Sequence, residues 1–269
     1  MRYLYPGGKQ KALTFSYDDG QDYDRKLIDI FNKHGLKGTF HLNSGTLGTV
    51  TSENTYILPE EVEKLYEGHE VACHSVNHKN MPRIPLSVIT RELYEDRVAL
   101  EKYSKKIVQG FSYPFGSYTE ELIDALKAVG IKYSRTVDAT HGFFPPGDFM
   151  KWHPTCHHDD NLIELGNKFL NVPDYVELPL MYVWGHSYEF GRPNDWKVIE
   201  EFSELMCGKN DIWYATNMEI CDYLTAIKSL EYSADESMVH NPTAIDIWLT
   251  DGEKTYVIKA GGCGYSIID

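Results

Sequence analysis

The sequence predicts a parallel α/β fold that closes into a barrel. Between residues 12 and 230, short apolar segments rich in β-forming residues alternate with amphipathic segments of helical period. This alternation is typical of parallel sheets whose strands are joined by helices. The strand and helix pattern repeats about seven times, which favours a barrel over an open sheet. Beyond residue 230 the period changes to that of short β-strands.

The boundaries of most elements follow from periodicity and from residues that end helices. The segment from Asp24 to His34, for example, carries Leu27 and Phe31 at helical spacing and ends before Gly35, which suits a left-handed cap. The expected strands are 12–17, 38–42, 70–73, 107–113, 131–136, 175–184 and 211–215. The expected helices are 24–34, 59–67, 86–103, 119–129, 195–206 and 218–230. Residues 137–173 are rich in Gly, Pro and His, and no element is expected there.

The C-terminal segment is expected to form a separate unit. Residues 246–249 and 255–259 alternate in the β period on either side of Asp251 and Gly252, which favour a tight hairpin turn. We therefore expect a barrel domain over residues 1–230 and a small β appendage over residues 231–269, packed on the barrel. An unpaired strand edge in this appendage would favour a homo-oligomer.

Composition and charge exclude several partners. The 269 residues contain 26 Lys and Arg against 40 Asp and Glu, a net charge of −14, without a basic patch. Nucleic acid and an anionic membrane surface are therefore not expected partners. No stretch approaches the roughly 18 apolar residues of a membrane span, and the N-terminus lacks a signal peptide's apolar core, so we expect a cytoplasmic protein. The five cysteines are widely spaced without a CxxC pair, and we expect reduced thiols.

Three polar clusters follow predicted strands. Asp18 and Asp19 come after the first strand, His74 and His78 after the third, and His186 after a late strand. Functional groups of parallel barrels gather at the carboxyl ends of the strands, so these side chains are expected to meet. Two histidines four apart on a helical turn can bind one divalent metal, with a carboxylate as third ligand and open positions for substrate. The aspartate that does not bind the metal can then take a proton from water as general base.

Each of these patterns also has an ordinary structural explanation. Asp-Asp-Gly is a good turn sequence, and an HxxxH spacing alone is weak evidence for a metal. Their combination at two strand ends favours a catalytic metal site. The segment from His153 to Asp160 is a second concentration of metal-binding residue types, and three readings stay open for it: an exposed polar loop, part of the cleft wall, or a second metal site.

These motifs resemble those of the polysaccharide deacetylase family, the NodB-homology domain of carbohydrate esterase family 4. They occur in the family's order: Thr14-Phe15-Ser16-Tyr17-Asp18-Asp19-Gly20, His74 with His78, Tyr113-Pro114-Phe115-Gly116, and Trp184-Gly185-His186. The resemblance covers roughly residues 10–230. It implies a distorted (β/α) barrel that hydrolyses N- or O-acetyl groups of a sugar or oligosaccharide with a divalent metal.

By this resemblance Asp18 is the general base, and His186 is the general acid that protonates the leaving group. Asp19, His74 and His78 are the metal ligands, with zinc expected and cobalt, manganese or nickel as alternatives. The expected substrate contacts are Tyr113, Pro114, Phe115, Trp152 and Trp184. Of these, the Phe115 amide would help hold the oxyanion, and the two tryptophans would wall a pocket for the acetyl methyl group.

Two positions depart from the family pattern. Ser112 stands where the family has an Arg that pairs with the base, and Lys151 stands where it has an Asp that tethers the catalytic His. Lys151 and Asp148 are candidates for taking over these roles. Two alternatives stay open. Relatives within the superfamily suggest a metal-independent, allantoinase-like amidohydrolase of another C–N bond, and the two departures suggest a carbohydrate-binding protein that has lost catalysis.

Overall fold

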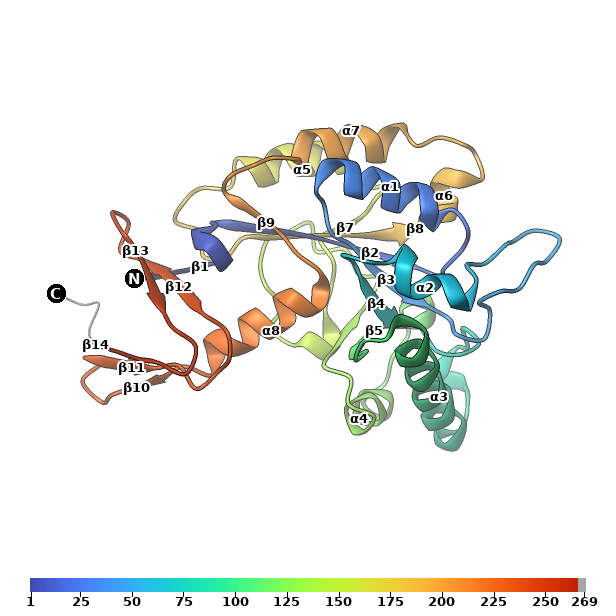
Figure 1. Cartoon of the computed structure of the whole chain (residues 1–269), viewed down its shortest axis with the longest axis horizontal. Helices are drawn as coiled ribbons and strands as arrows, with labels where there is room; N and C mark the ends of the chain where they lie inside the picture. The colour runs from blue at the N-terminus through green and yellow to red at the C-terminus, as the bar shows by residue number, and fades with distance from the viewer. Residues whose placement is uncertain (266–269) are drawn as a thin grey trace.

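The computed structural model describes residues 1–265, and a curled parallel sheet lies at its centre, as predicted (Figure 1). The strands follow the order β6-β5-β4-β3-β2-β8-β7, and β9 pairs with the first residues of β2. They are β2 (Lys11–Asp18), β3 (Thr39–Leu42), β4 (Glu70–Cys73), β5 (Gly110–Ser112), β6 (Tyr133–Arg135), β7 (Cys156–His157), β8 (Leu180–His186) and β9 (Ile212–Tyr214). All of their pairings are parallel.

One extended segment connects the two sides of this sheet. The Trp152 amide donates to the Ser134 carbonyl at 3.0 Å, beside β6, and Cys156 pairs with Val183 in β8. Residues 152–157 therefore link β6 to β8 and curl the sheet into a barrel, which confirms the predicted fold class.

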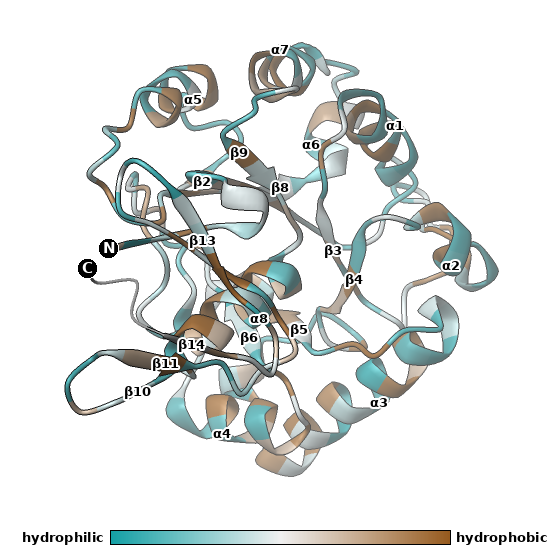
Figure 2. Cartoon of the chain, turned by 60° about the vertical axis from the view of Figure 1, so that its left-hand side comes forward, coloured by the Kyte–Doolittle hydropathy of each residue, from teal (hydrophilic) through white to brown (hydrophobic). Residues whose placement is uncertain are grey.

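Helices surround the sheet and turn their apolar sides toward it (Figure 2). They are α1 (Asp24–His34), α2 (Val62–Leu65), α3 (Leu86–Ser104), α4 (Glu120–Ala128), α5 (Leu162–Leu170), α6 (Ser187–Gly191), α7 (Lys197–Met206) and α8 (Asn217–Lys228). The core contact between α1 and β2 is typical: the Phe31 and Phe15 rings are 4.6 Å apart between centroids, and both side chains are buried. No helix within residues 1–265 combines the length and apolar character that a membrane crossing needs.

Two local expectations were wrong. Helix α5 lies inside the segment expected to be irregular. Its buried residues Leu162, Leu165 and Phe169 do follow a helical spacing. The Gly, Pro and His residues before it masked this short period. Residues 74–78 form a loop instead of a helical turn, because Ser75 and His78 have positive φ values of 65° and 49°.

The C-terminal segment forms two small antiparallel sheets. The predicted hairpin is present, and the first strand of the chain joins its sheet, in which β12 lies between β1 and β13. The sheets consist of β1 (Arg2–Leu4), β12 (Ile247–Thr250) and β13 (Thr255–Ile258), and of β10 (Glu231–Tyr232), β11 (Met238–His240) and β14 (Cys263–Tyr265). Residues 266–269 of the expected appendage lie outside the described residues.

These sheets and α8 cover the amino-terminal end of the barrel. At the start of α8 the Asn217 amide donates to Thr39 Oγ1 at 3.0 Å and the Met218 amide to Glu70 Oε2 at 2.8 Å. Thr39 and Glu70 are the first residues of β3 and β4. One apolar cluster joins α8, through Tyr223, to the small sheets. The carboxyl ends of the barrel strands, where the polar clusters lie, are therefore at the opposite end.

A buried carboxyl group in α1 predicts a pH-dependent stability. Asp24 is 1 % exposed; burial raises its pKa to about 7, against the hydrogen bonds that it accepts from Ser187 and Tyr66. The folded state therefore favours the neutral form of Asp24. The protein's free energy of unfolding falls as pH rises from the pKa of Asp24 in the unfolded chain to about 7. Asp24→Asn is expected to remove this loss, which amounts to about 4 kcal/mol for about three pKa units.

Urea unfolding of the wild type and Asp24→Asn at about pH 4.5 and about pH 8 measures the effect. The stability difference between the two proteins should shift in favour of the variant at the higher pH. Asp29→Asn, an exposed change on the same helix, is the matched control and should show no such shift. A difference for Asp24→Asn that does not vary with pH would contradict the prediction.

Candidate active site

The predicted polar clusters meet at the carboxyl end of the barrel. Asp18 is the last residue of β2, and His186 is its partner at the end of the neighbouring β8. His74 follows β4 directly, and Arg135 is the last residue of β6. Parallel strands bring these ends together, which is how residues far apart in the sequence come to share one site.

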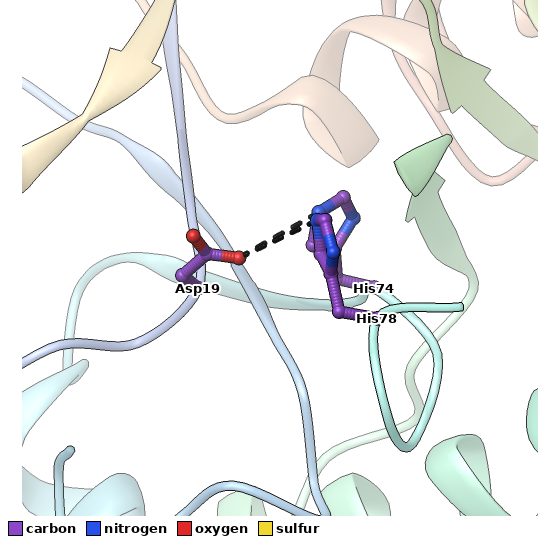
Figure 3. Close-up of side chains that lie close together, drawn as sticks. All are labelled: Asp19, His74 and His78. Atoms are coloured by element: carbon purple, nitrogen blue, oxygen red, sulfur yellow. Dashed lines mark ion pairs between the residues drawn. The ribbon is translucent and has the colours of Figure 1, made fainter. Parts of the chain in front are cut away.

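Asp19, His74 and His78 form a compact group of side chains that could hold a metal ion (Figure 3). Asp19 Oδ1 lies 3.8 Å from Nε2 of both histidines, and the three ligand atoms are within 4.8 Å of one another. Two bonds of about 2.1 Å to one ion span at most about 4.2 Å, which accommodates the two 3.8 Å separations. Two imidazoles and one carboxylate leave coordination positions open, as catalytic sites require.

The surroundings of His74 prepare its ring for a metal. His74 Nδ1 lies 2.8 Å from the Ser112 carbonyl oxygen, which can only accept, so Nδ1 carries the proton and Nε2 keeps its lone pair. Burial lowers the pKa of His74 to about 3, which keeps the ring neutral. The backbone is also fixed, since the His74 amide donates to Asp96 Oδ2 of α3 at 3.1 Å. The residues therefore fit a divalent ion.

Asp18 is paired with a buried arginine that the sequence did not predict. The Arg135 guanidinium forms an ion pair with Asp18 Oδ2 and donates from Nε to Ser16 Oγ at 3.1 Å. Its Cζ lies 4.4 Å from the centre of the Trp184 ring, so the guanidinium contacts this ring as well as Asp18 and Ser16. Asp18 and Arg135 are 3 % and 0 % exposed. Asp18 is thus a buried carboxylate with a fixed cation.

His186 has a carboxylate partner in α6. Its Nδ1 lies 3.2 Å from Glu189 Oε2, and its amide donates to the same oxygen at 2.8 Å. Burial lowers the pKa of His186, but Glu189 and Asp18 outweigh burial and raise it overall. The ring therefore favours the protonated form that a general acid needs.

The surroundings shift the pKa values of the two adjacent aspartates in opposite directions. Burial would raise the pKa of Asp18, but Arg135 and His74 outweigh burial and hold it well below the usual range. Burial also raises the pKa of Asp19, and the neighbouring Asp18 charge adds to the rise. One carboxylate is thus stable as an anion, and the other gains most from a nearby cation.

The expected substrate residues are placed differently from one another. Phe115 is 61 % exposed, has a positive φ of 61°, and its ring lies 4.6 Å from the His78 ring. Trp184 lies against Arg135. Trp152 is 1 % exposed and packs on Tyr182 in the core cluster near α8, and this burial does not support a place in the acetyl pocket.

Tyr113 and Pro114 are also buried. The Tyr113 hydroxyl donates to the Met150 carbonyl at 2.8 Å, so this side chain is engaged inside the protein. Of the predicted substrate residues, Phe115 is the exposed side chain beside the candidate metal ligands.

Lys151 and Asp148, which were expected to replace the family's Arg and Asp, make other contacts. Lys151 pairs with Glu120 at the surface, and Asp148 caps a short turn by accepting from the Met150 amide. Ser112 Oγ donates to Asp18 Oδ1 at 3.3 Å, so it contacts this carboxylate without supplying a charge.

Arg135 and Glu189 are the residues that sequence reasoning missed. An Arg at the carboxyl end of a predicted strand was a signal for Arg135, because a buried cation needs a buried anion. The signal for Glu189 was its place three residues after His186, at the start of a helix. Neither signal indicates which residue the charged side chain contacts.

Comparison with known proteins agrees with the predicted resemblance. The sequence profile of the family described as "Polysaccharide deacetylase" matches residues 6–134. A chitin deacetylase of Arthroderma benhamiae is 34% identical over 84 residues, which are 30% of this chain and 21% of that protein. An uncharacterized protein of Bacillus subtilis is 27% identical over 124 residues, 45% of this chain and 37% of that one. The matches thus span well under half of these relatives' lengths.

Solved structures support the fold. A putative polysaccharide deacetylase from Mycobacterium smegmatis superposes with a TM-score of 0.62 at 19% identity, covering 84% of this chain and 94% of that one. A domain of a multidomain xylanase from the hindgut metagenome of Trinervitermes trinervoides reaches a TM-score of 0.51 at 16% identity, over 83% and 96% of the two chains. The barrel is therefore that of the polysaccharide deacetylases.

Proposed function

We propose that this chain, whose residues 6–134 belong to the polysaccharide deacetylase family, is a metal-dependent hydrolase that removes N- or O-acetyl groups from a sugar or oligosaccharide. The observation that carries the proposal is the ionised Asp18, fixed by Arg135 beside the group of Asp19, His74 and His78. A base next to a metal-binding triad is the arrangement that hydrolysis of an amide or ester needs.

Each group has a defined part in this reaction. A bound divalent ion, which we expect to be zinc, would be held by Asp19, His74 and His78 and would supply Lewis acidity to the acetyl carbonyl. Asp18 takes a proton from the attacking water. His186, on the strand next to Asp18, donates a proton to the nitrogen or oxygen of the sugar as its bond to the acetyl carbon breaks. The products are acetate and the free amine or hydroxyl.

The alternative of a binding protein without catalysis was based on Ser112 and Lys151. Arg135 and Glu189 argue against it, because each supplies a charge to Asp18 or His186 from another position. The names of relatives, among them a chitin deacetylase, support an N-acetylated glycan as the first substrate to test.

Release of acetate from N-acetylated chitooligosaccharides tests the proposal, with metal-stripped protein and after addition of Zn²⁺. We expect metal-dependent release by the wild type. His78→Ala should weaken metal binding by more than about 100-fold, because losing a ligand costs more than losing a group that only hydrogen-bonds to a ligand. It should also abolish acetate release at matched metal concentration. His34→Ala, at the end of α1, is the control and should behave as the wild type.

Three results would contradict the proposal in different ways. Full metal-dependent activity of His78→Ala would show that the ligands are misassigned. Hydrolysis of a ureide without release of acetate would favour the amidohydrolase. Glycan binding without turnover at any metal or pH would favour the binding protein.

A further inference from the structure

A second group of ligand-type side chains lies where β7 faces the start of α6. Nε2 of His157 is 3.1 Å and Nε2 of His158 is 3.4 Å from Glu189 Oε2. The ligand atoms of the three residues all lie within 4.8 Å of one another. The same oxygen also accepts from the His186 amide and faces the His186 ring, so it has more nitrogen neighbours than its two lone pairs can serve.

His158 is the residue that most needs an explanation. It is 0 % exposed, and neither of its ring nitrogens has a hydrogen-bond partner in the described part of the chain. A buried imidazole without partners costs free energy unless another group binds it. Nε2 lies 3.3 Å from Asp159 Oδ1 and 3.4 Å from Glu189 Oε2, but neither contact has the angle of a hydrogen bond.

The ring of His158 is held in this position by its neighbours. It stacks on Tyr17 at 5.8 Å and lies 4.1 Å from the Phe190 ring, between centroids. Gly185 lies so close that a Cβ there would be 2.0 Å from His158 Nδ1. Only glycine at position 185 lets the ring pack against β8, which leaves Nε2 as the atom that faces Glu189.

We propose that His157, His158 and Glu189 form a second binding site for a divalent ion of the zinc type. Two imidazoles and a carboxylate are typical zinc ligands. Metal bonds of about 2.0–2.2 Å in a tetrahedron place neighbouring ligand atoms about 3.3–3.6 Å apart. The two distances to Glu189 Oε2, 3.1 and 3.4 Å, are close to this spacing.

The site has an entrance and is separate from the first one. The side chains of His157 and Glu189 are 23 % and 28 % exposed, so an ion can reach the buried His158 from solvent. Its ligands come from β7, the loop after it and α6, whereas Asp19, His74 and His78 follow β2 and β4. The two sites share no metal ligand, but Glu189 of the second site also contacts His186 of the candidate active site, so zinc stoichiometry, and not acetate release, tests the second site.

Zinc titration of the full chain, in competition with a chromophoric chelator, tests this site. The wild type is expected to bind two equivalents of Zn²⁺. His74→Ala with His78→Ala should keep one. Adding His157→Gln to that double variant should weaken the remaining site by more than about 100-fold. His141→Gln in the same background is the matched control, since His141 pairs with Asp160 outside the cluster, and it should leave the site intact.

Two results would overturn the proposal: a single equivalent in the wild type with none in the double variant, or a remaining site that ignores His157→Gln. Circular dichroism and thermal unfolding establish that each variant is folded. If the double variant does not fold, the wild type and His157→Gln alone decide, because the single change should reduce two equivalents to one. Loss of acetate release without loss of the second equivalent concerns only the proposed function.

Discussion

Replacing Arg135 by methionine is expected to lower kcat for acetyl hydrolysis by about 10²–10⁴-fold, the usual contribution of a general base. Methionine keeps much of the side chain's length but removes the cation that holds Asp18 ionised. KM should change little, because Arg135 is 0 % exposed and lies behind Asp18 and Trp184. Steady-state kinetics on an N-acetylated chitooligosaccharide separates the two constants.

The same substitution should also destabilise the fold. Removing one partner of a buried ion pair costs about 3–5 kcal/mol, since it leaves a buried charge uncompensated. Arg25→Met is the control for loss of an arginine: Arg25 pairs with Asp22 and Glu61 near the surface, where an ion pair contributes about 0–1 kcal/mol. This variant should keep both kcat and most of its stability.

A double variant distinguishes a positioning role from a merely structural one. Ser112→Arg with Arg135→Ser moves the cation to the place where the family carries it, within reach of Asp18. We expect the double variant to recover part of the kcat lost in Arg135→Met. If Arg135→Met keeps wild-type kcat, Asp18 does not need this cation and its assignment as the base fails.

The grouping of Asp19, His74 and His78 could be predicted from sequence because its signals are local. Asp19 directly follows an apolar strand, and His74 and His78 follow another at a spacing that brings two imidazoles together. The backbone that does so was not predictable, since the loop uses positive φ values at Ser75 and His78 where the spacing suggested a helical turn. Residue spacing constrains distance, and more than one backbone conformation satisfies it.

The cation that supports Asp18 could not be predicted because its position depends on register across the sheet. Arg135 is 117 residues from Asp18 and meets it only through the order and stagger of the strands between β6 and β2. Lys151 and Asp148, the expected replacements, therefore do not contact Asp18 or His186 and instead contact Glu120 and the Met150 amide. The cation and the carboxylate are both present, but they come from β6 and α6.

His186 is expected to show a dependence on the leaving group that Asp18 does not. A general acid matters most when the departing group is a poor one, as an amine is, and little when it leaves as a stabilised anion. His186→Gln should therefore lower kcat/KM on an N-acetylated chitooligosaccharide by about 10²–10⁴-fold. On 4-nitrophenyl acetate it should cost less than about tenfold, because nitrophenolate needs no proton.

Asp18→Asn is the matched comparison, since both substrates require an activated water. It should lower kcat/KM on both by about 10²–10⁴-fold. Equal losses for His186→Gln on the two substrates would contradict its role as the acid and indicate that the ring acts on the water or on the oxyanion. A selective loss would mean that His186 protonates the leaving group, a role that agrees with its contact to Glu189, at 3.2 Å from Nδ1, as the Arg135 contact agrees with an ionised Asp18.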